Sequence, residues 1–473
     1  MSSKLKICVS LWGRFFLIST FPIILAVVFF HSLSSVSFAQ TSDDVNVYIY
    51  LPLVVKSSPF PSTEPPPFPV VPTMTVRISN TIAFIVDEGH HSLWIANVDG
   101  TGEKKILDEV SESLSSGDEW KNRVVWSPDG QRLAVNRYGG LWILSPDGDN
   151  LTEVVPVNWA EGKDITNLAW SPDGDKIAFL QRTEINTYYL GIVNVASGDI
   201  NYITKNPRLE HRLLWSPDSK WIALSDHDML SVTNVNSQTI TSLGYGCQGG
   251  YIVMFSWSPQ SDRLAVQDVG NGRYSHGESC VMTLDGQKFP LNVEGSSGKP
   301  AWTSDGNNLY VSATNFDPDN PDLEKDPRML FFDKTGQFIK RLNITAEVGE
   351  LAEFSPNKQH FLSWIANEQN WFTGYIQVAC LNEAQPCSKK TKVNMIGRLF
   401  NADDLNALYV WAMDSRNAFF LSVTDMIYTF DLRYGSIYAF DEQSGRLKRV
   451  TNDHKIKNVA VSPLIGPTDP LIP

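Results

Sequence analysis

One five-residue motif recurs along this chain and constrains its fold more than any other feature of the sequence. Successive copies lie 44, 45, 42, 45, 52 and 57 residues apart. This period is long enough for one supersecondary unit, so the chain is expected to be an array of similar units. The copies read WSPDG at 126–130 and 170–174, WSPDS at 215–219, WSPQS at 257–261 and WTSDG at 302–306, with weaker copies FSPNK at 354–358 and WAMDS at 411–415.

Each copy of the motif is followed by the same succession of short segments. An apolar strand comes first, a second apolar strand follows, and a glycine-containing turn leads to a last strand. Dipeptides such as Asp-Gly favour this turn because they supply the positive φ that a tight hairpin needs. Four strands at this period indicate one four-stranded blade of a β-propeller. The first strands begin at Leu133, Ile177, Ile222, Leu264 and Leu309, and the glycine turns are at 99–100, 147–148, 197–198, 285–286, 335–336 and 444–445.

The motif itself predicts a turn and a packing contact. Pro presets φ at the second position of the turn, and Gly accepts a left-handed conformation at the last. The Trp before the turn recurs at the same point of each unit. We therefore expect it to pack between neighbouring blades rather than to stack on a ligand.

A motif WSPDG followed by an apolar–Ala–apolar strand resembles the repeat of the TolB-type, or PD40, variety of WD40-like propellers. The resemblance covers roughly residues 78–463 and implies an all-β propeller. The chain departs from TolB itself, which carries an α/β domain before its propeller, whereas an export signal and a Pro-rich spacer are expected here. The role of TolB in the Tol–Pal envelope system is therefore not carried over.

The two ends of the repeat region complement each other. The first unit, from about Thr81, has no motif before it, and the segment Val459–Pro463 looks like a motif without its following strands. We expect the C-terminal strand to complete the first blade and to close the ring, which removes exposed sheet edges. This gives eight blades over 76–465 and a tail at 466–473. Seven blades are the alternative, because the later units are irregular.

Residues 1–39 have the features of an export signal. Three basic residues precede an uncharged apolar run from Phe15 to Phe30, and a small-x-small cleavage pattern ends at Ala39. An uncleaved signal anchor is the alternative, although the run is slightly short for a membrane span of roughly 20 residues. Residues 40–75 include the segment SSPFPSTEPPPFPVVP, which favours a stiff spacer. The protein is thus predicted to be secreted, periplasmic or on the cell surface.

The charge balance excludes some partners. The formal net charge is −13, and the export signal is itself basic, so the remainder is more acidic still. Nucleic acid is not expected as a partner, because its binding depends on Lys and Arg that neutralise phosphates. Contact with a membrane is expected only through an uncleaved signal.

Four cysteines follow the signal, and an even number in an exported chain permits two disulfides. Their spacing favours Cys380 with Cys387 as a local staple. It also favours Cys247 with Cys280 across neighbouring repeats. Four unpaired thiols are the alternative.

No catalytic motif stands out, since the chain has no Gly-x-Ser-x-Gly, His-Glu-x-x-His, Cys-x-x-Cys or phosphate-binding glycine loop. The strongest ion candidate is an acidic insertion whose carboxylates could supply oxygen ligands for calcium. It lacks the glycine and the terminal glutamate of an EF-hand, and a solvated acidic loop is the alternative. No other cofactor is expected. The carboxylates are Asp317, Asp319, Asp322, Glu324 and Asp326.

One side of the expected ring carries the candidates for a binding surface. Loops from second to third strands and loops between blades emerge on the same side, and they carry aromatic residues. Each aromatic residue alone could equally be loop packing. The candidates are Trp120, Tyr138, Trp159, Tyr274, His276, Phe316 and Trp371.

These observations favour a non-catalytic binding scaffold outside the cytoplasm, with a protein or glycan as its partner. The alternative is a propeller-based hydrolase or lyase that acts on polysaccharide or peptide. That activity would need carboxylates within about 10 Å of one another at the central channel. A structural component of a surface layer is a third hypothesis.

Overall fold

The computed structural model divides into two compact units, Met1–Ile78 and Ser79–Pro473. In the first unit the structure describes two short strands, β1 (Val45–Asn46) and β2 (Thr75–Val76), which pair antiparallel. The described residues are 45–46, 75–76, 81–110, 124–157, 163–184, 187–206, 212–225, 229–237, 240–247, 249–269, 277–293, 296–298, 300–314, 328–342, 353–367, 370–381, 388–394, 396–397, 410–411, 417–423, 434–441 and 444–461.

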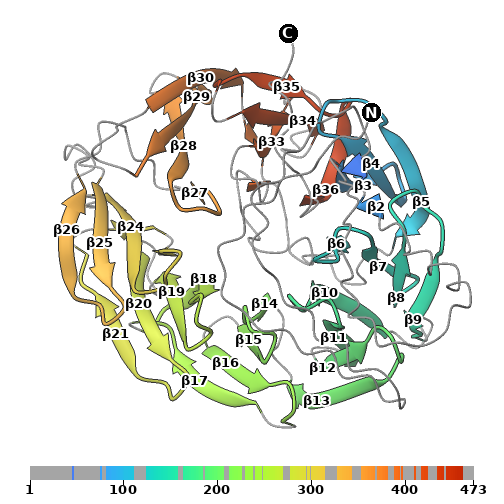
Figure 1. Cartoon of the computed structure of the whole chain (residues 1–473), viewed down its shortest axis with the longest axis horizontal. Coiled ribbons are helices and arrows are strands. Elements are labelled where there is room, and N and C mark those ends of the chain that lie inside the picture. The colour runs from blue at the N-terminus through green and yellow to red at the C-terminus, as the bar shows by residue number, and fades with distance from the viewer. Residues whose placement is uncertain are drawn as a thin grey trace, which may run out of the picture. The chain divides into compact units, whose positions relative to one another are not determined.

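The second unit is built from antiparallel sheets of mostly four strands, which confirms the all-β prediction. Five of these sheets follow one another in chain order (Figure 1). Their strands are β10 (Asp164–Trp170), β11 (Lys176–Glu184), β12 (Thr187–Asn194) and β13 (Ile200–Asn206); β14 (Arg212–Trp215), β15 (Trp221–Ser225), β16 (Met229–Asn234) and β17 (Thr241–Tyr245); β18 (Tyr251–Trp257), β19 (Arg263–Val269), β20 (Gly277–Thr283) and β21 (Lys288–Leu291); β22 (Ser296–Ser297), β23 (Ala301–Trp302), β24 (Asn308–Thr314), β25 (Arg328–Asp333) and β26 (Phe338–Leu342); and β27 (Glu353–Phe354), β28 (His360–Asn367), β29 (Asn370–Cys380) and β30 (Ser388–Asn394).

The remaining strands form one 13-stranded sheet in which three groups can be followed. The first group combines the end of the chain with the beginning of the unit, since β36 pairs antiparallel with β3 and Ala83 lies opposite Ala460 (Figure 1). The groups are β36 (His454–Val461), β3 (Thr81–Asp87), β4 (His91–Asn97) and β5 (Lys104–Val110); β6 (Val124–Trp126), β7 (Leu133–Arg137), β8 (Gly140–Leu144) and β9 (Thr152–Val155); and β31 (Ile396–Gly397), β32 (Val410–Trp411), β33 (Asn417–Val423), β34 (Tyr434–Asp441) and β35 (Leu447–Arg449).

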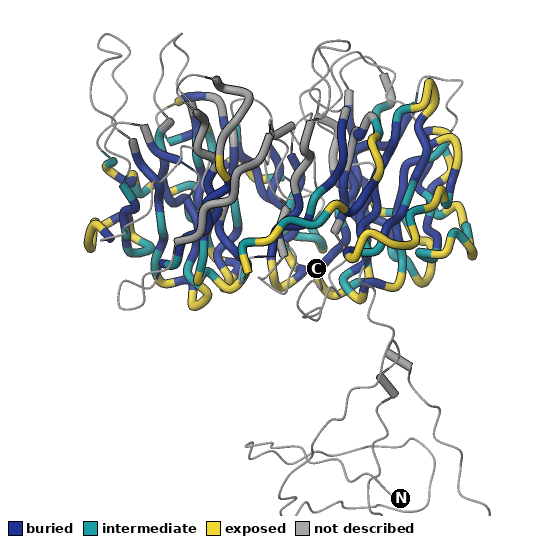
Figure 2. Tube along the Cα trace, turned by 90° about the horizontal axis from the view of Figure 1, so that it is seen from above, coloured by how far each residue is buried: buried dark blue, intermediate teal, exposed yellow. Residues whose placement is uncertain are grey.

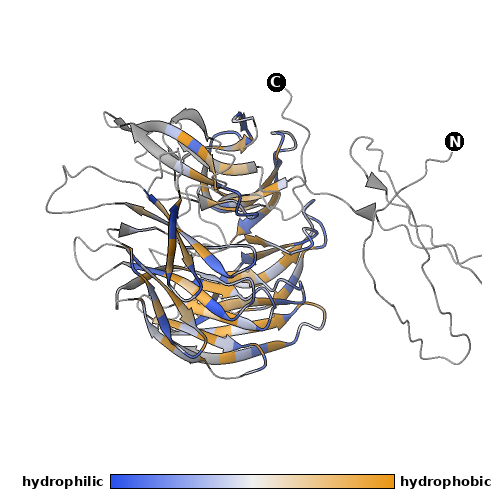
Figure 3. Ribbon diagram, turned by 60° about the vertical axis from the view of Figure 1, so that its left-hand side comes forward, coloured by the Kyte–Doolittle hydropathy of each residue, from blue (hydrophilic) through white to orange (hydrophobic). Residues whose placement is uncertain are grey.

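The hydrophobic core lies between neighbouring sheets. One cluster joins Val125 and Leu141 of the group β6–β9 to Ile165 and Ile177 of the next sheet, and the other clusters span adjacent sheets in the same way. Hydrophobic residues are concentrated in the strands (Figure 3), and most strand residues are buried or half-buried while many turn residues are exposed (Figure 2). Burial of apolar area between sheets stabilises the arrangement by about 25 cal/mol per Å².

The motif tryptophans Trp126, Trp170, Trp215, Trp257 and Trp302 are buried, and four of these five indoles donate a hydrogen bond to a strand of the preceding sheet or group. The N–H of Trp215 donates to the carbonyl of Ala169 at 3.0 Å, in the preceding sheet. Trp257 and Trp302 make the same contact with the sheet before them, at 3.2 and 3.3 Å. Trp126 donates to the carbonyl of Ala460 on β36 at 3.0 Å. These four indoles are thereby satisfied and tie their sheets to the preceding ones, whereas the buried indole N–H of Trp170 has no hydrogen-bond partner among the described residues.

No helix among the described residues is long and apolar enough to cross a membrane.

Candidate functional site

The two ends of the sheets differ because antiparallel strands alternate in direction. One end, which we call the motif face, carries the motif turns and the glycine hairpins. The opposite end, which we call the loop face, carries the turns from second to third strands and the crossings between sheets. The described turn at Tyr138–Gly139, between β7 and β8, belongs to the loop face.

Hydrogen bonds fix the motif face. In the first motif turn, the hydroxyl of Ser127 donates to the carboxylate of Asp129 at 2.5 Å and accepts from the backbone N–H of Arg132 at 2.9 Å. The turns also contact one another, since the N–H of Asp173 donates to the hydroxyl of Ser219 at 3.0 Å in the following sheet. The polar side chains of these turns are thus occupied by hydrogen bonds within the motif face.

The motif carboxylates link stability to pH. Partial burial raises the pKa of Asp173, but hydrogen bonds from Ser171 and from the backbone of Asp175 outweigh it, so the pKa lies below its ordinary value. The pKa of Asp218 is lowered in the same way. The hydrogen bond from Thr303 lowers the pKa of Asp305. Carboxyl groups with a lowered folded pKa stabilise the fold above their unfolded pKa, and this stabilisation is lost as the pH falls through the folded pKa.

We therefore expect the free energy of unfolding to change little between about pH 7 and 5 and to fall steeply below about pH 4. Urea unfolding at a series of pH values measures this. The variant Ser171→Ala should have a smaller acid-dependent loss, because its Asp173 returns toward the ordinary pKa. A profile that stays flat to about pH 3 contradicts the expectation.

Buried polar residues fill the half of the sheets nearest the loop face. The amide of Asn136, near the end of β7, donates to the carbonyl of Ile165 in the next sheet. The hydroxyl of Ser279 lies 2.8 Å from that of Ser297, and Gln267 donates to the Ser297 carbonyl at 2.7 Å. Hydrogen bonds thus join neighbouring sheets here in addition to apolar packing, which gives this end a specific geometry.

Charged side chains begin the inner strands at the same end. Asp164 opens β10 and forms an ion pair with Arg182 at 2.9 Å, with 2% and 13% of the two side chains exposed. Arg212 opens β14, is buried, and places its guanidinium 5.3 Å from the ring of Phe255. Buried charges are costly unless they are compensated, so their occurrence in adjacent sheets marks this end as chemically specialised.

Tyr138 is the sequence-predicted binding residue whose surroundings the structure describes. It is 50% exposed and has a φ of 52°, which is unusual for a bulky residue. The turn is held to the next sheet because the Gly139 carbonyl accepts from the Ile165 N–H at 2.8 Å. The guanidinium of Arg137 lies 4.6 Å from the Tyr138 ring and 5.5 Å from that of Trp142. The tyrosine is thus presented to solvent by a rigid support.

The other predicted candidates are not among the side chains that the structure describes. Trp120, Trp159, Tyr274, His276 and Phe316 lie outside the described residues, as do the side chain of Trp371 and the acidic insertion from Asp317 to Asp326. Within the described part of the chain, no group of three or more His, Cys, Asp and Glu could hold a metal ion.

Sequence reasoning did not single out Tyr245, Arg182 or Arg212. Tyr245 ends β17 at the loop face and is 56% exposed. Its signal in the sequence is its place directly before a glycine-rich crossing, Gly246 to Gly250, at a sheet boundary.

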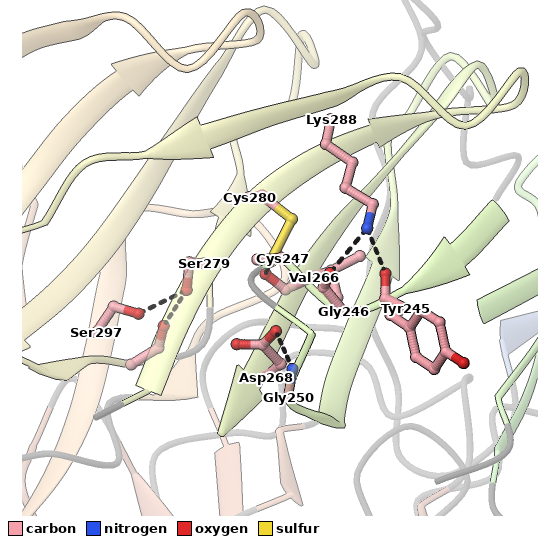
Figure 4. The surroundings of a disulfide bond; sticks show 11 residues. Tyr245, Gly246, Cys247, Gly250, Val266, Asp268, Ser279, Cys280, Lys288 and Ser297 are labelled. Atoms are coloured by element: carbon pink, nitrogen blue, oxygen red, sulfur yellow. Dashed lines mark hydrogen bonds between the residues drawn. A yellow bond between two sulfur atoms is a disulfide. The ribbon is translucent and has the colours of Figure 1, made fainter. Parts of the chain in front are cut away.

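A disulfide between Cys247 and Cys280 fastens this crossing to the next sheet (Figure 4). The ammonium of Lys288 donates to the carbonyls of Tyr245 and Gly246 at 2.8 and 2.9 Å. Beneath the crossing, the buried carboxylate of Asp268 accepts from the N–H of Gly250 at 3.3 Å. The loop face is therefore covalently braced at this point. Cys380 is also disulfide-bonded, and Cys387 lies outside the described residues.

Comparisons with known proteins concern the fold alone. No protein-family model and no curated protein matches the chain. Among solved structures, dihydro-heme d1 dehydrogenase NirN in complex with DHE matches with a TM-score of 0.51 and 15% identity, over 82% of this chain and 76% of that one. A eukaryotic initiation factor has a TM-score of 0.47 and 12% identity, over 80% and 98% of the two chains. TolB from Acinetobacter baumannii has 0.32 and 13%, over 66% and 80%.

Proposed function

We propose that this protein is an exported, non-catalytic β-propeller that holds a protein or glycan partner at its loop face. The observation that carries the proposal is the presentation of Tyr138. A half-exposed tyrosine stands in a strained backbone conformation on a turn that hydrogen bonds fix to the next sheet. Tyrosine offers a large contact area at low entropic cost.

The proposal includes a closed ring of eight blades, built from repeats of the TolB-type, or PD40, kind. Its support is the pairing of β36 with β3 and the hydrogen bond from Trp126 to Ala460. This bond repeats, between the first and second groups, the contact that Trp215 and Trp257 make between later sheets. In a closed ring each sheet packs between two neighbours, which would hold its loops in place, so a partner would be bound at little cost in loop entropy.

The N-terminal segment and the acidic insertion complete the proposal. Residues 1–39 would direct export, and residues 40–75 would space the ring from the signal. The carboxylates of Asp317, Asp319 and Asp322 would draw calcium or a cationic part of the partner to the loop face.

The test is site-specific photo-crosslinking. A benzophenone amino acid replaces Tyr138, and in a matched variant it replaces Ser197, an exposed residue of a hairpin on the motif face. Each variant is irradiated with the surface and extracellular fractions of the cells that make the protein, with and without calcium. We expect a discrete adduct from position 138. Equal yields from both positions, or an adduct from position 197 alone, would contradict a partner at the loop face.

A further inference from the structure

The outer strand β26 differs from the loop face in both position and chemistry. It is the outermost strand of its sheet and pairs with β25. The first four of its five residues are exposed, and Leu342 is buried. An outermost strand turns a row of backbone N–H and C=O groups outward, which is a template for a further strand.

The exposed apolar side chains of the described residues are concentrated on this strand. Of the six exposed large hydrophobic residues, four are tyrosines, and the other two are the adjacent Phe338 and Ile339 at 57% and 48% exposure. The register of β25 and β26 shifts here, since Phe332 lies opposite Phe338 and Phe331 opposite Lys340, so Ile339 is the extra residue of a β-bulge. The ring of Phe338 also packs edge-on against Phe332 at 5.7 Å, which holds it in place.

Two other outer strands, β5 and β21, carry features that prevent edge pairing. In β5, two cations lie at one end, Lys104 and Lys105, and two carboxylates lie near the other, Asp108 and Glu109. In β21 there is a proline, Pro290. Charges and proline are the usual means of blocking an edge. In β26 there is no proline and no carboxylate, and the only charges are the cations of Lys340 and Arg341.

The two cations of β26 favour a partner strand that carries negative charge. Both also interact within the chain, and Lys334 adds a third positive charge in the preceding turn. Full-length antiparallel pairing of two β26 strands would place Lys340 opposite Lys340 of the other copy. Like charges directly opposite are destabilising, so a second copy is disfavoured and an acidic strand is favoured.

We propose that β26 is a docking edge for an extended acidic segment of a partner protein, which adds to the sheet as one more strand. Main-chain hydrogen bonds would supply affinity, and the side chains on both faces would supply specificity. Apolar residues of the segment would contact Phe338 and Ile339, and carboxylates would face Lys340 and Arg341. This site is separate from the one proposed at the loop face.

The probe is a capped peptide of about eight alternating valine and glutamate residues, the length of an added strand. Its affinity is measured by fluorescence anisotropy at moderate salt. We expect Lys340→Glu with Arg341→Glu to weaken binding about tenfold or more, and Phe338→Ser with Ile339→Ser to do the same. The matched control, Lys104→Glu with Lys105→Glu on β5, makes the same charge change and should bind within about twofold of the parent protein.

A second peptide separates strand addition from charge attraction. It has the same side chains but is N-methylated at alternate residues, so it cannot form a ladder of backbone hydrogen bonds, and it should not bind. Equal binding of the two peptides, or an equal loss in the β5 control, overturns the docking edge. Tyr138→Ala should leave the peptide affinity unchanged, so failure here and failure at the loop face are distinguishable.

Discussion

Removal of residues 454–473 is expected to abolish cooperative unfolding of the second unit. The deletion takes away β36, whose Ile456 and Val459 are buried in the core with residues of β3 and β4. It also removes the carbonyl that accepts from Trp126 and leaves one edge of β3 unpaired. Each buried apolar side chain contributes about 1.5–3 kcal/mol, so the loss of several removes a large part of a free energy of unfolding that is usually about 5–15 kcal/mol.

Circular dichroism during urea titration measures this effect, with gel filtration to detect aggregates. The matched control removes residues 462–473, which follow β36, and should keep the sigmoidal transition of the full chain. A truncation at residue 454 that unfolds with the same midpoint as this control would show that β36 is dispensable.

The residues that lead into β36 make polar contacts with the start of the unit, and the truncation removes some of these contacts. The carboxylate of Glu103 accepts from the N–H and the side-chain amide of Asn452 at 2.8 and 3.0 Å, and it contacts the imidazole of His454. The imidazole lies 5.0 Å from the Trp94 ring. Glu103, near the start of the unit, therefore contacts Asn452 and His454, near its end, beside the Trp94 ring.

Replacement of Cys247 and Cys280 by alanine is expected to lower the free energy of unfolding by about 3–4 kcal/mol. The two cysteines are 33 residues apart, so their disulfide restricts a long loop in the unfolded chain. The replacement also releases the crossing that lies over Asp268.

Urea unfolding measures this loss. The control is the parent protein held in mild reductant under native conditions, where the buried Cys280 should keep the disulfide intact and the midpoint unchanged. An alanine variant with the parent midpoint would mean that the disulfide adds nothing to stability.

The motif and its spacing were enough to predict most of the strands, because each copy places a turn directly after an inner strand. The turn forms even where the motif lacks glycine, since Ser219, Ser261 and Lys358 take positive φ values of 59°, 63° and 56°. The packing of the motif tryptophans between sheets was also predictable. Their hydrogen bonds were not, because the acceptors, such as the carbonyl of Ala169, are backbone atoms present at every residue.

The candidate site was less accessible from the sequence. Tyr138 could be selected because its loop falls between two clear strands. The buried pair of Asp164 and Arg182 could not, since the two residues face each other only through the register of β10 and β11. Phe338 and Ile339 were missed because an apolar segment has the same pattern whether its strand is outermost or central.

Closure of the ring by its last strand is tested most directly by an engineered disulfide. Ala83 and Ala460 lie opposite each other on β3 and β36, and both are buried. In the variant Ala83→Cys with Ala460→Cys, mass spectrometry of unreduced peptides should detect a bond between the two positions. The control Ala83→Cys with Ala265→Cys, whose second site belongs to a different core cluster, should form none. Free thiols at positions 83 and 460 under oxidising conditions would contradict the closed ring.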